Sequence, residues 1–213
     1  MDWGALGVSF KLAAATTIIL LIIGIPLAAW MAFTRFRFLA VLEAFLLLPF
    51  VLPPTVLGFY LLIILAPAHI AFTFTSILIG SVILNLPLAL QAFVEAFRSV
   101  DRSLIEGYLS LGANQRQTFY GLVLRLSWPG VLSGLALAFA HTFGEFGVAM
   151  MVGGNIRGET RTMSIAIYDG VQSFDFTQAR QTATVQVAIC FAFLIVISLL
   201  KSRQRQTLRS QTI

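Results

Sequence analysis

Long stretches of the chain carry none of the four charged residue types. Asp, Glu, Lys and Arg are absent from residues 12–34, 44–94, 126–144 and 181–200. A helix that crosses the hydrocarbon core of a bilayer needs about 20 apolar residues, so each stretch is long enough to span. The second stretch is too long for one helix, and Pro67 lies near its middle, where a helix has to end. The pattern therefore predicts five transmembrane helices, at residues 6–33, 40–66, 71–97, 122–150 and 181–200.

The apolar stretches are continuous, which distinguishes helices from the strands of a membrane barrel. Barrel strands alternate apolar and polar residues over about ten positions, and the segment Phe191–Leu200 does not alternate. The composition agrees, because 58% of the residues are hydrophobic and only 11% are charged, against about 25% charged in soluble domains. We therefore expect an all-α, polytopic integral membrane protein with one transmembrane domain over residues 1–213.

The basic residues indicate the orientation of the chain, because Lys and Arg collect in cytoplasmic loops. Ten of the fourteen flank one side of the predicted spans: Arg35, Arg37, Arg98, Arg102, Arg116, Arg125, Lys201, Arg203, Arg205 and Arg209. The other side has only Lys11, Arg157, Arg161 and Arg180. We expect a protein of the cytoplasmic membrane with its N-terminus outside, its C-terminus in the cytoplasm, a cytoplasmic loop at 99–121 and an external loop at 152–180.

Several classes of function find no support in the sequence. The net charge is +5, but the basic residues flank spans instead of clustering with aromatic residues on one soluble face, so we expect no nucleic-acid partner. The single cysteine, Cys190, supports neither a disulfide nor a metal site. The G-x-x-x-x-G-K-[ST] motif that cradles ATP phosphates is absent, and the only lysines are Lys11 and Lys201. The chain is therefore expected to be non-catalytic and to hold no cofactor itself.

The cytoplasmic loop 99–121 carries signals for a short helix. Ser103 precedes Glu106 by three residues, which is the spacing of a capping box. Gly112 can take the left-handed conformation that ends a helix, and Asn114 can cap the next one. The apolar residues between these signals are Leu104, Ile105, Tyr108, Leu109 and Leu111. They predict an amphipathic helix on the cytoplasmic face that docks onto another protein.

One pair of polar residues within the fourth predicted span suggests a different class of function. His141 and Glu145 are four residues apart, so a continuous helix would place them on one face, where they could share a metal or a proton. A metal site needs a third ligand, and no further His or Cys lies nearby in the sequence. An intramembrane enzyme that uses His141 and Glu145 without an ATPase partner remains the alternative to a transport function.

The cytoplasmic loop resembles a loop of importer permeases of the ATP-binding-cassette superfamily. That loop has the pattern E-A-A-x3-G-x9-I-x-L-P, and the matching positions here are Glu106, Gly112, Leu122 and Leu124. Gly107 and Tyr108 replace the alanines, and Arg125 replaces the proline. The resemblance implies that Ser103 to Gly112 form a coupling helix that fits a groove on a separate ATPase, where ATP and Mg are bound.

Two further stretches resemble the molybdate and sulfate permeases. Phe143–Gly147 and the following Gly154–Thr162 are similar to their G-E-F-G and G-N-I-P-G-x-T-x-T motifs, with Arg157 in place of the proline. Leu48–Gly58 resembles the L-P-L-V-L-P-P-x-V-x-G stretch of molybdate permeases in particular. The implied function is that of the transmembrane subunit of an ATP-driven importer for a tetrahedral oxyanion. Molybdate or tungstate is expected as the substrate, with sulfate or thiosulfate as the alternative.

The resemblance also implies an assembly that works by alternating access. In that family two identical permease subunits enclose a path at their interface within membrane lipid, two ATPase subunits bind on the cytoplasmic side, and a substrate-binding protein binds outside. The loop at 152–176 would then face the binding protein. The second copy of this chain, the two ATPases and the binding protein are thus the expected partners.

Prolines, glycines and neutral polar residues near the spans are the candidates for the path or gate: Pro53, Pro54, Thr55, Thr142, Gly144, Glu145, Gly147, Asn155 and Thr160. Neutral hydrogen-bond donors bind an anion weakly enough to release it, and glycines allow close helix approach or hinge motion. Glu145 would repel an anion. We therefore expect its carboxylate to be paired with Arg157 or Arg161, or turned away from the path.

Overall fold

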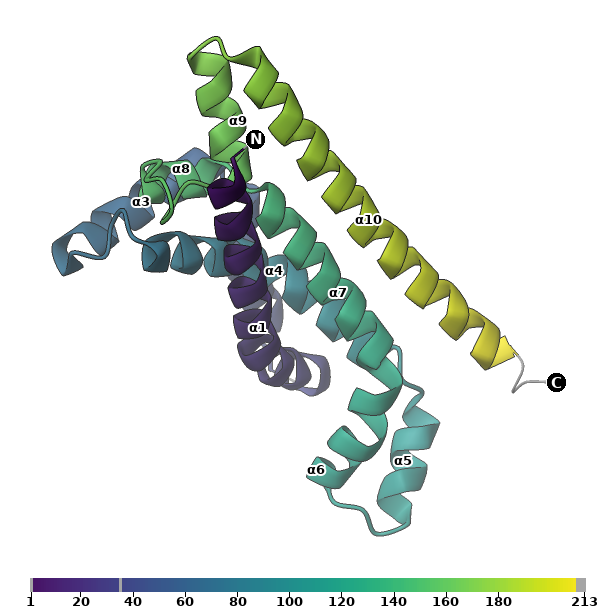
Figure 1. Cartoon of the computed structure of the whole chain (residues 1–213). Coiled ribbons are helices and arrows are strands. Elements are labelled where there is room, and N and C mark those ends of the chain that lie inside the picture. Colours follow the sequence, from purple (N-terminus) through teal and green to yellow (C-terminus); the bar gives the residue numbers. More distant parts are fainter. Residues whose placement is uncertain (1, 35, 210–213) are drawn as a thin grey trace.

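The computed structural model describes residues 2–34 and 36–209, with side chains as far as Ile195. All elements in this part of the chain are helices, which confirms the all-α class (Figure 1). In order they are α1 (Trp3–Phe33), α2 (Leu39–Val51), α3 (Pro54–Leu65), η1 (Ala66–Ala68), α4 (Phe74–Arg98), α5 (Arg102–Ser110), α6 (Gln115–Thr118), η2 (Phe119–Val123), α7 (Leu124–Gly144), α8 (Gly147–Gly153), α9 (Met163–Gln172) and α10 (Phe176–Arg209).

Helices α1, α4 and α7 pack together as the centre of the molecule. Phe93 and Phe97 of α4 are fully buried in one apolar cluster with residues of α1 and α7. Small residues bring α4 and α7 into close contact: a Cβ atom at Gly134 would lie 2.6 Å from the Cβ of Ala92. Such close approach is typical of helices that associate by van der Waals packing in a membrane.

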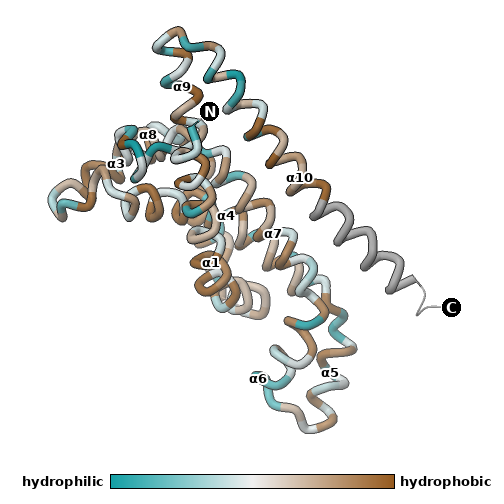
Figure 2. The backbone as a smooth tube through the Cα atoms, in the orientation of Figure 1, coloured by the Kyte–Doolittle hydropathy of each residue, from teal (hydrophilic) through white to brown (hydrophobic). Residues whose placement is uncertain are grey.

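Among the described residues, three continuous helices are long and apolar enough to cross a membrane: Trp3–Phe33, Phe74–Arg98 and Gln115–Gly144. The tube in Figure 2 is predominantly hydrophobic along α1, α4 and α7. The fifth predicted span, 181–200, lies within α10, and its last residues fall outside the described side chains. The orientation also stays a prediction, because Arg35 and the basic run Lys201 to Arg209 lie outside the described residues or side chains.

The predicted span 40–66 is not one continuous helix. It consists of α2 and α3, which meet at Leu52 and Pro53 with a bend of 99° and together make a broken span or a re-entrant loop. The cause lies in the sequence, because Pro53 and Pro54 have no backbone N–H and α2 cannot continue through them. Pro54 instead opens α3, a position where its missing donor costs nothing.

The predicted span 122–150 is also interrupted. Helix α7 ends at Gly144, and Glu145 takes an extended backbone conformation with ψ 134° before α8 begins at Gly147. At the other end, α6, the π-helical turn η2 and α7 form one continuous helix that begins at Gln115, earlier than expected. In Figure 1, α5 and α6 project from one end of the bundle, whereas α8, α9 and the start of α1 lie at the opposite end.

Candidate functional site

The predicted coupling helix exists as α5, but its N-terminal cap differs from the prediction. The cap is Asp101, whose Oδ1 accepts a hydrogen bond of 2.9 Å from the backbone N–H of Ser103. Ser103 is therefore inside the helix, and the expected capping box with Glu106 is wrong. The hydrogen bonds from Ser103 hold the pKa of the Asp101 carboxyl below its ordinary value, because they stabilise the charged form.

The end of α5 follows the prediction closely. Gly112 has φ 89°, and its backbone N–H donates to the carbonyl of Leu109 at 3.0 Å, so the helix stops in a left-handed turn. Asn114 then caps α6 in a reciprocal capping box with Gln117, in which both hydrogen bonds measure 2.9 Å. Both ends of this turn are thus determined by local hydrogen bonds.

The apolar face of α5 is divided between the bundle and solvent. Ile105 packs against the apolar cluster of the bundle, which includes Phe97 of α4 and Phe119 of η2. The side chains that remain exposed are Leu104 (51%), Tyr108 (37%), Leu109 (42%) and Leu111 (87%). Exposed apolar surface of this kind is typical of protein interaction sites.

The two interrupted spans meet at their breaks. A Cβ atom at Gly147, the first residue of α8, would lie 2.6 Å from the Cβ of Pro54, the first residue of α3. One at Gly58 would lie 2.7 Å from the Cβ of Met151, so the two short helices are in contact along their length. The structure therefore brings together Pro53, Pro54, Thr55 and Gly147 of the predicted gate, and Thr55 is exposed.

Glu145 stabilises the break between α7 and α8 with its own side chain. Its Oε1 accepts a hydrogen bond of 2.8 Å from the backbone N–H of Val148 and so caps α8, and the residue is only 7% exposed. A carboxylate is favourable at a helix N-terminus because it faces the positive end of the helix dipole. The expected pair with Arg157 or Arg161 is wrong, because none of the ion pairs among the described residues involves Glu145.

Two of the predicted path threonines use their hydroxyls within the protein. Thr142 donates to the carbonyl of Ala138 at 2.8 Å, and Thr160 donates to the carbonyl of Gly153 at 2.6 Å. Thr160 also accepts from the backbone N–H of Ile156 at 2.9 Å. Both threonines are buried, so they hold the local backbone and do not face solvent.

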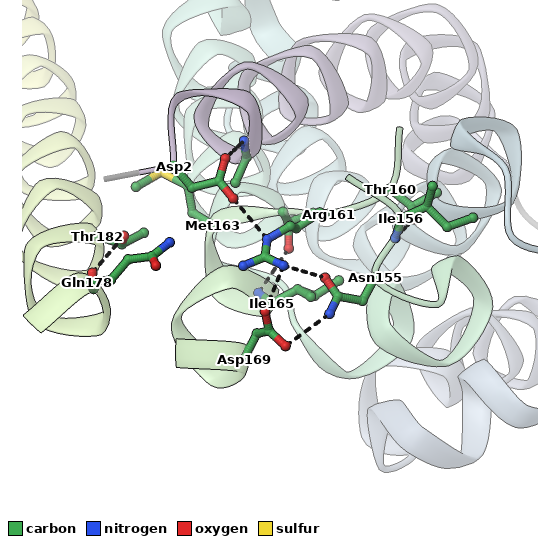
Figure 3. Close-up of polar contacts among 12 residues, drawn as sticks. Asp2, Asn155, Ile156, Thr160, Arg161, Met163, Ile165, Asp169, Gln178 and Thr182 are labelled. Carbon is green, nitrogen blue, oxygen red and sulfur yellow. Dashed lines mark hydrogen bonds and ion pairs between the residues drawn. The ribbon is translucent and has the colours of Figure 1, made fainter. Parts of the chain in front are cut away.

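Sequence reasoning missed a network centred on Arg161 (Figure 3). The guanidinium lies 2.9 Å from Asp2 Oδ2 and 2.7 Å from Asp169 Oδ2, and it donates to the Asn155 side-chain oxygen at 3.3 Å. Arg161 is buried, whereas the partner carboxylates remain partly accessible. The network connects three parts of the chain: the start of α1, the loop between α8 and α9, and α9 itself. Its partners are too far apart in the sequence for their pairing to be predicted from it.

His141 and Glu145 do not form the pair that an intramembrane enzyme would require. The chain leaves the helical path at Glu145, so the expected shared helix face does not exist there. Instead, His141 Nδ1 lies 2.8 Å from Oδ1 of Asn85 on α4. No group of three or more His, Cys, Asp or Glu side chains that could hold a metal occurs in the part of the chain that the structure describes.

Comparison with known proteins gives consistent results. Residues 24–204 match the model of the family described as "Binding-protein-dependent transport system inner membrane component". The chain is 38% identical to the molybdenum transport system permease protein ModB of Azotobacter vinelandii, over 95% of each chain. It is 32% identical to a putative molybdenum transport system permease protein, YvgM, of Bacillus subtilis, over 89% of each.

A solved structure shares the fold. A chain of the MetNI methionine ABC transporter, in an inward-facing conformation, superposes with a TM-score of 0.77 at 13% sequence identity, covering 93% of this chain and 94% of that one. With its paired broken helices and its projecting helix α5, the chain is a multi-pass, non-catalytic permease of the inner membrane and belongs to the family of inner membrane components of binding-protein-dependent transport systems.

Proposed function

We propose that this chain is the permease subunit of an ATP-driven importer for molybdate or tungstate. The observation that carries the proposal is 38% identity along 95% of the chain to a molybdenum transport permease. The G-E-F-G motif lies at the break between α7 and α8, where Glu145 bonds to Val148. The G-N-I-x-G motif lies in the loop between α8 and α9, where Thr160 bonds to Gly153. The similarity of both motifs to those of molybdate and sulfate permeases supports the proposal. Sulfate or thiosulfate is the alternative substrate, since all these anions are tetrahedral and doubly charged.

The working unit that we propose is a homodimer, with the path between the two copies. The support comes from α2, which is apolar except for Glu43 and yet has no buried residue in the single chain. Val41 is 66% exposed, Phe45 69% and Val51 75%. Val41 and Phe45, four residues apart, share one side of the helix, and Val51 lies on another. A helix with exposed apolar residues on more than one side belongs inside a larger assembly or in lipid, and a second copy would cover part of it.

We infer that α5 docks into a groove of a cytoplasmic ATPase, which binds ATP and Mg. The exposed side chains Leu104, Tyr108 and Leu109 suit an apolar groove, and Ile105 connects the helix to the bundle core. Movement of the ATPase would therefore reach α4 and α7 as a rigid-body displacement, which is the usual way that packed helices transmit motion. This arrangement requires α5 in the cytoplasm and the N-terminus outside, where the loop 152–176 would meet the binding protein.

We place the gate where α3 and α8 meet. Pro53, Pro54, Thr55, Gly144 and Gly147 lie at the two breaks, and Thr55 offers an accessible hydroxyl. Thr142, Glu145, Asn155 and Thr160 would maintain the shape of the gate through their internal hydrogen bonds. Alternating access would then open these breaks alternately to the two sides of the membrane.

The test is uptake of radiolabelled molybdate and sulfate into vesicles that contain this chain with its ATPase and binding protein. The double variant Glu106→Ala, Gly112→Pro should lose both ATPase association and uptake, because it alters the exposed face and the terminating turn of α5. Ser110→Ala is the matched control on the same helix, since it removes only a hydroxyl that donates to the carbonyl of Glu106. Full activity of the isolated chain without an ATPase would disprove the proposal.

A further inference from the structure

Ser164 of α9 connects the end of α7 to α10 through two consecutive hydrogen bonds. Its hydroxyl donates to the carbonyl of Gly144 at 2.9 Å, and Nε2 of Gln186 on α10 donates to the same hydroxyl oxygen at 3.0 Å. A hydroxyl has a single proton to donate, and the carbonyl of Gly144 can only accept it. Gln186 must therefore present its amide nitrogen to Ser164, so the direction of both hydrogen bonds is determined.

The carbonyl that Ser164 binds lies at the break between α7 and α8. Gly144 is the last residue of α7, and the chain leaves the helical path directly after it. The last four carbonyls of a helix have no partner within that helix, and Ser164 supplies one for Gly144 from another helix. On the other side of the break, Glu145 caps α8. The two sides of the break are thus held by different elements, α7 by α9 and α8 by its own cap.

Helices α9 and α10 form a closely packed hairpin. A Cβ atom at Gly170 of α9 would lie 3.2 Å from the Cβ of Ala179 on α10, and both residues are buried. The turn between the two helices carries the exposed side chain of Phe174. In Figure 1 this turn lies at the end of the molecule that also holds α8 and the start of α1. A displacement of the turn would therefore reach Gly144 through the hairpin and Ser164.

Gln186 is an unusual side chain for its surroundings. Together with Ser164 it lines a groove of about 700 Å³ between α9 and α10, whose walls are mainly apolar and include Phe146, Val187 and Phe191. A polar group among apolar side chains is costly unless it is hydrogen-bonded. The Oε1 atom of Gln186 is buried and has no hydrogen-bond partner among the described residues. A leucine here would avoid that cost, so the amide is explained by what its nitrogen does, which is to hold the hydroxyl of Ser164.

We propose that Ser164 is a positioning residue of the gate, and that Gln186 keeps its hydroxyl in place. This inference deepens the proposed function and rests on it. Because the hydroxyl ties the end of α7 to α9, the hairpin and the α7 side of the break move as one body, as packed helices do. When the loaded binding protein contacts the hairpin, the end of α7 moves relative to α8, whose cap is Glu145. The same movement continues along α7 toward the ATPase, so Ser164 couples arrival of the binding protein to ATP hydrolysis.

The experiment measures two quantities in vesicles that contain this chain with its ATPase: molybdate uptake, and the stimulation of ATP hydrolysis by the molybdate-loaded binding protein. Ser164→Ala should lower both by about fivefold or more, the lower end of the usual coupling between two sites. Basal ATP hydrolysis and the melting temperature should stay at the wild-type values. Ser164→Thr keeps a hydroxyl and should restore both quantities. Gln186→Met keeps the length of the side chain without the amide, and it should lower both as well.

Ser173→Ala is the matched control on the same helix. The hydroxyl of Ser173 donates to the carbonyls of Asp169 and Gly170, which belong to α9 itself, so its loss breaks no connection to α7. Uptake and stimulation should therefore stay at the wild-type level in this variant.

The outcomes separate this inference from the function on which it rests. Wild-type uptake and stimulation in Ser164→Ala, or a loss that Ser164→Thr does not restore, would overturn the positioning role and leave the transport function intact. A loss that merely follows a lowered melting temperature would also overturn it, as would failure of both Ser164→Ala and Gln186→Met to assemble with the ATPase. If only Ser164→Ala fails to assemble, the result for Gln186→Met decides. Absence of any molybdate uptake by wild type would refute the transport function itself.

Discussion

Arg161 Nη1 lies 2.7 Å from Asp169 Oδ2, in a cluster that also holds Asp2 at 2.9 Å from Nε. The arginine is buried, so its charge depends on these carboxylates for stabilisation. The cluster joins the first turn of α1 to α9, two elements that are far apart in sequence (Figure 3). It therefore provides a rigid frame beside the breaks at which we place the gate.

Arg161→Met should destabilise the protein by on the order of 3 kcal/mol, because removing one partner of a buried ion pair leaves charges uncompensated. The measurement is thermal unfolding of the purified protein in detergent. Arg157→Met is the matched control, since Arg157 lies in the same loop and is exposed. Equal melting temperatures for the two variants would show that the cluster contributes little.

Glu145→Ala should lower stability by about 1 kcal/mol, the usual cost of losing a helix cap. Glu145→Gln should cost less, because an amide oxygen can still accept from the backbone N–H of Val148. Uptake at a fixed temperature should follow the same order if the cap maintains the gate. A Gln variant as impaired as the Ala variant would mean that the negative charge matters more than the hydrogen bond.

Gly147→Ala should disturb the contact between the two breaks. The added Cβ would lie 2.6 Å from the Cβ of Pro54, which cannot move without its backbone. We expect a loss of stability of about 1 to 3 kcal/mol, as for overpacked cores, together with reduced uptake. Gly7→Ala is the control, because its Cβ would have no neighbour within 4 Å. A tolerated Gly147→Ala would contradict the close packing of α3 on α8.

The cap of α5 should depend on pH in a defined direction. The pKa of Asp101 is lowered in the folded protein by the hydrogen bonds from Ser103. Its stabilising contribution is therefore complete above the ordinary aspartate range and is lost as the pH falls through the lowered value. Carboxyl chemical shifts from NMR would follow this titration. Asp101→Asn should cap α5 without the pH dependence, whereas a titration at or above the ordinary aspartate value would contradict the hydrogen bond.

Local signals in the sequence were sufficient for several elements. Gly112 and Asn114 ended one helix and began the next as predicted, because such turns depend on backbone conformation and on neighbouring hydrogen bonds. The prolines at 53 and 54 lack a backbone donor, so the cause of the break between α2 and α3 is present in the sequence. The bend of 99° could not be derived from them, because it depends on how α3 packs against α8.

The hydrogen-bond partners of the side chains could not be predicted from the sequence. Helical spacing suggested that His141 and Glu145 share a face, but the helix ends between them and each residue bonds to a different element. Asp101 took the cap assigned to Ser103 because its carboxylate precedes the first helical residue and reaches the same free backbone donors. Nearby polar side chains compete for the same backbone donors, and the spacing of residues in the sequence does not show which side chain forms the hydrogen bond.

The amino-acid sequence by itself determined that this chain crosses a membrane as helices and which segment projects as a short amphipathic helix, and it contains the prolines that interrupt the second span. These properties follow from apolar length, missing backbone donors and local capping, all of which act within a few residues. Only the tertiary structure decided that Arg161 pairs with Asp2 and Asp169, that Asn85 orients His141, and that Pro54 meets Gly147. Each of these contacts joins residues from separate parts of the chain, and their distance in space is determined by the packing of the whole bundle.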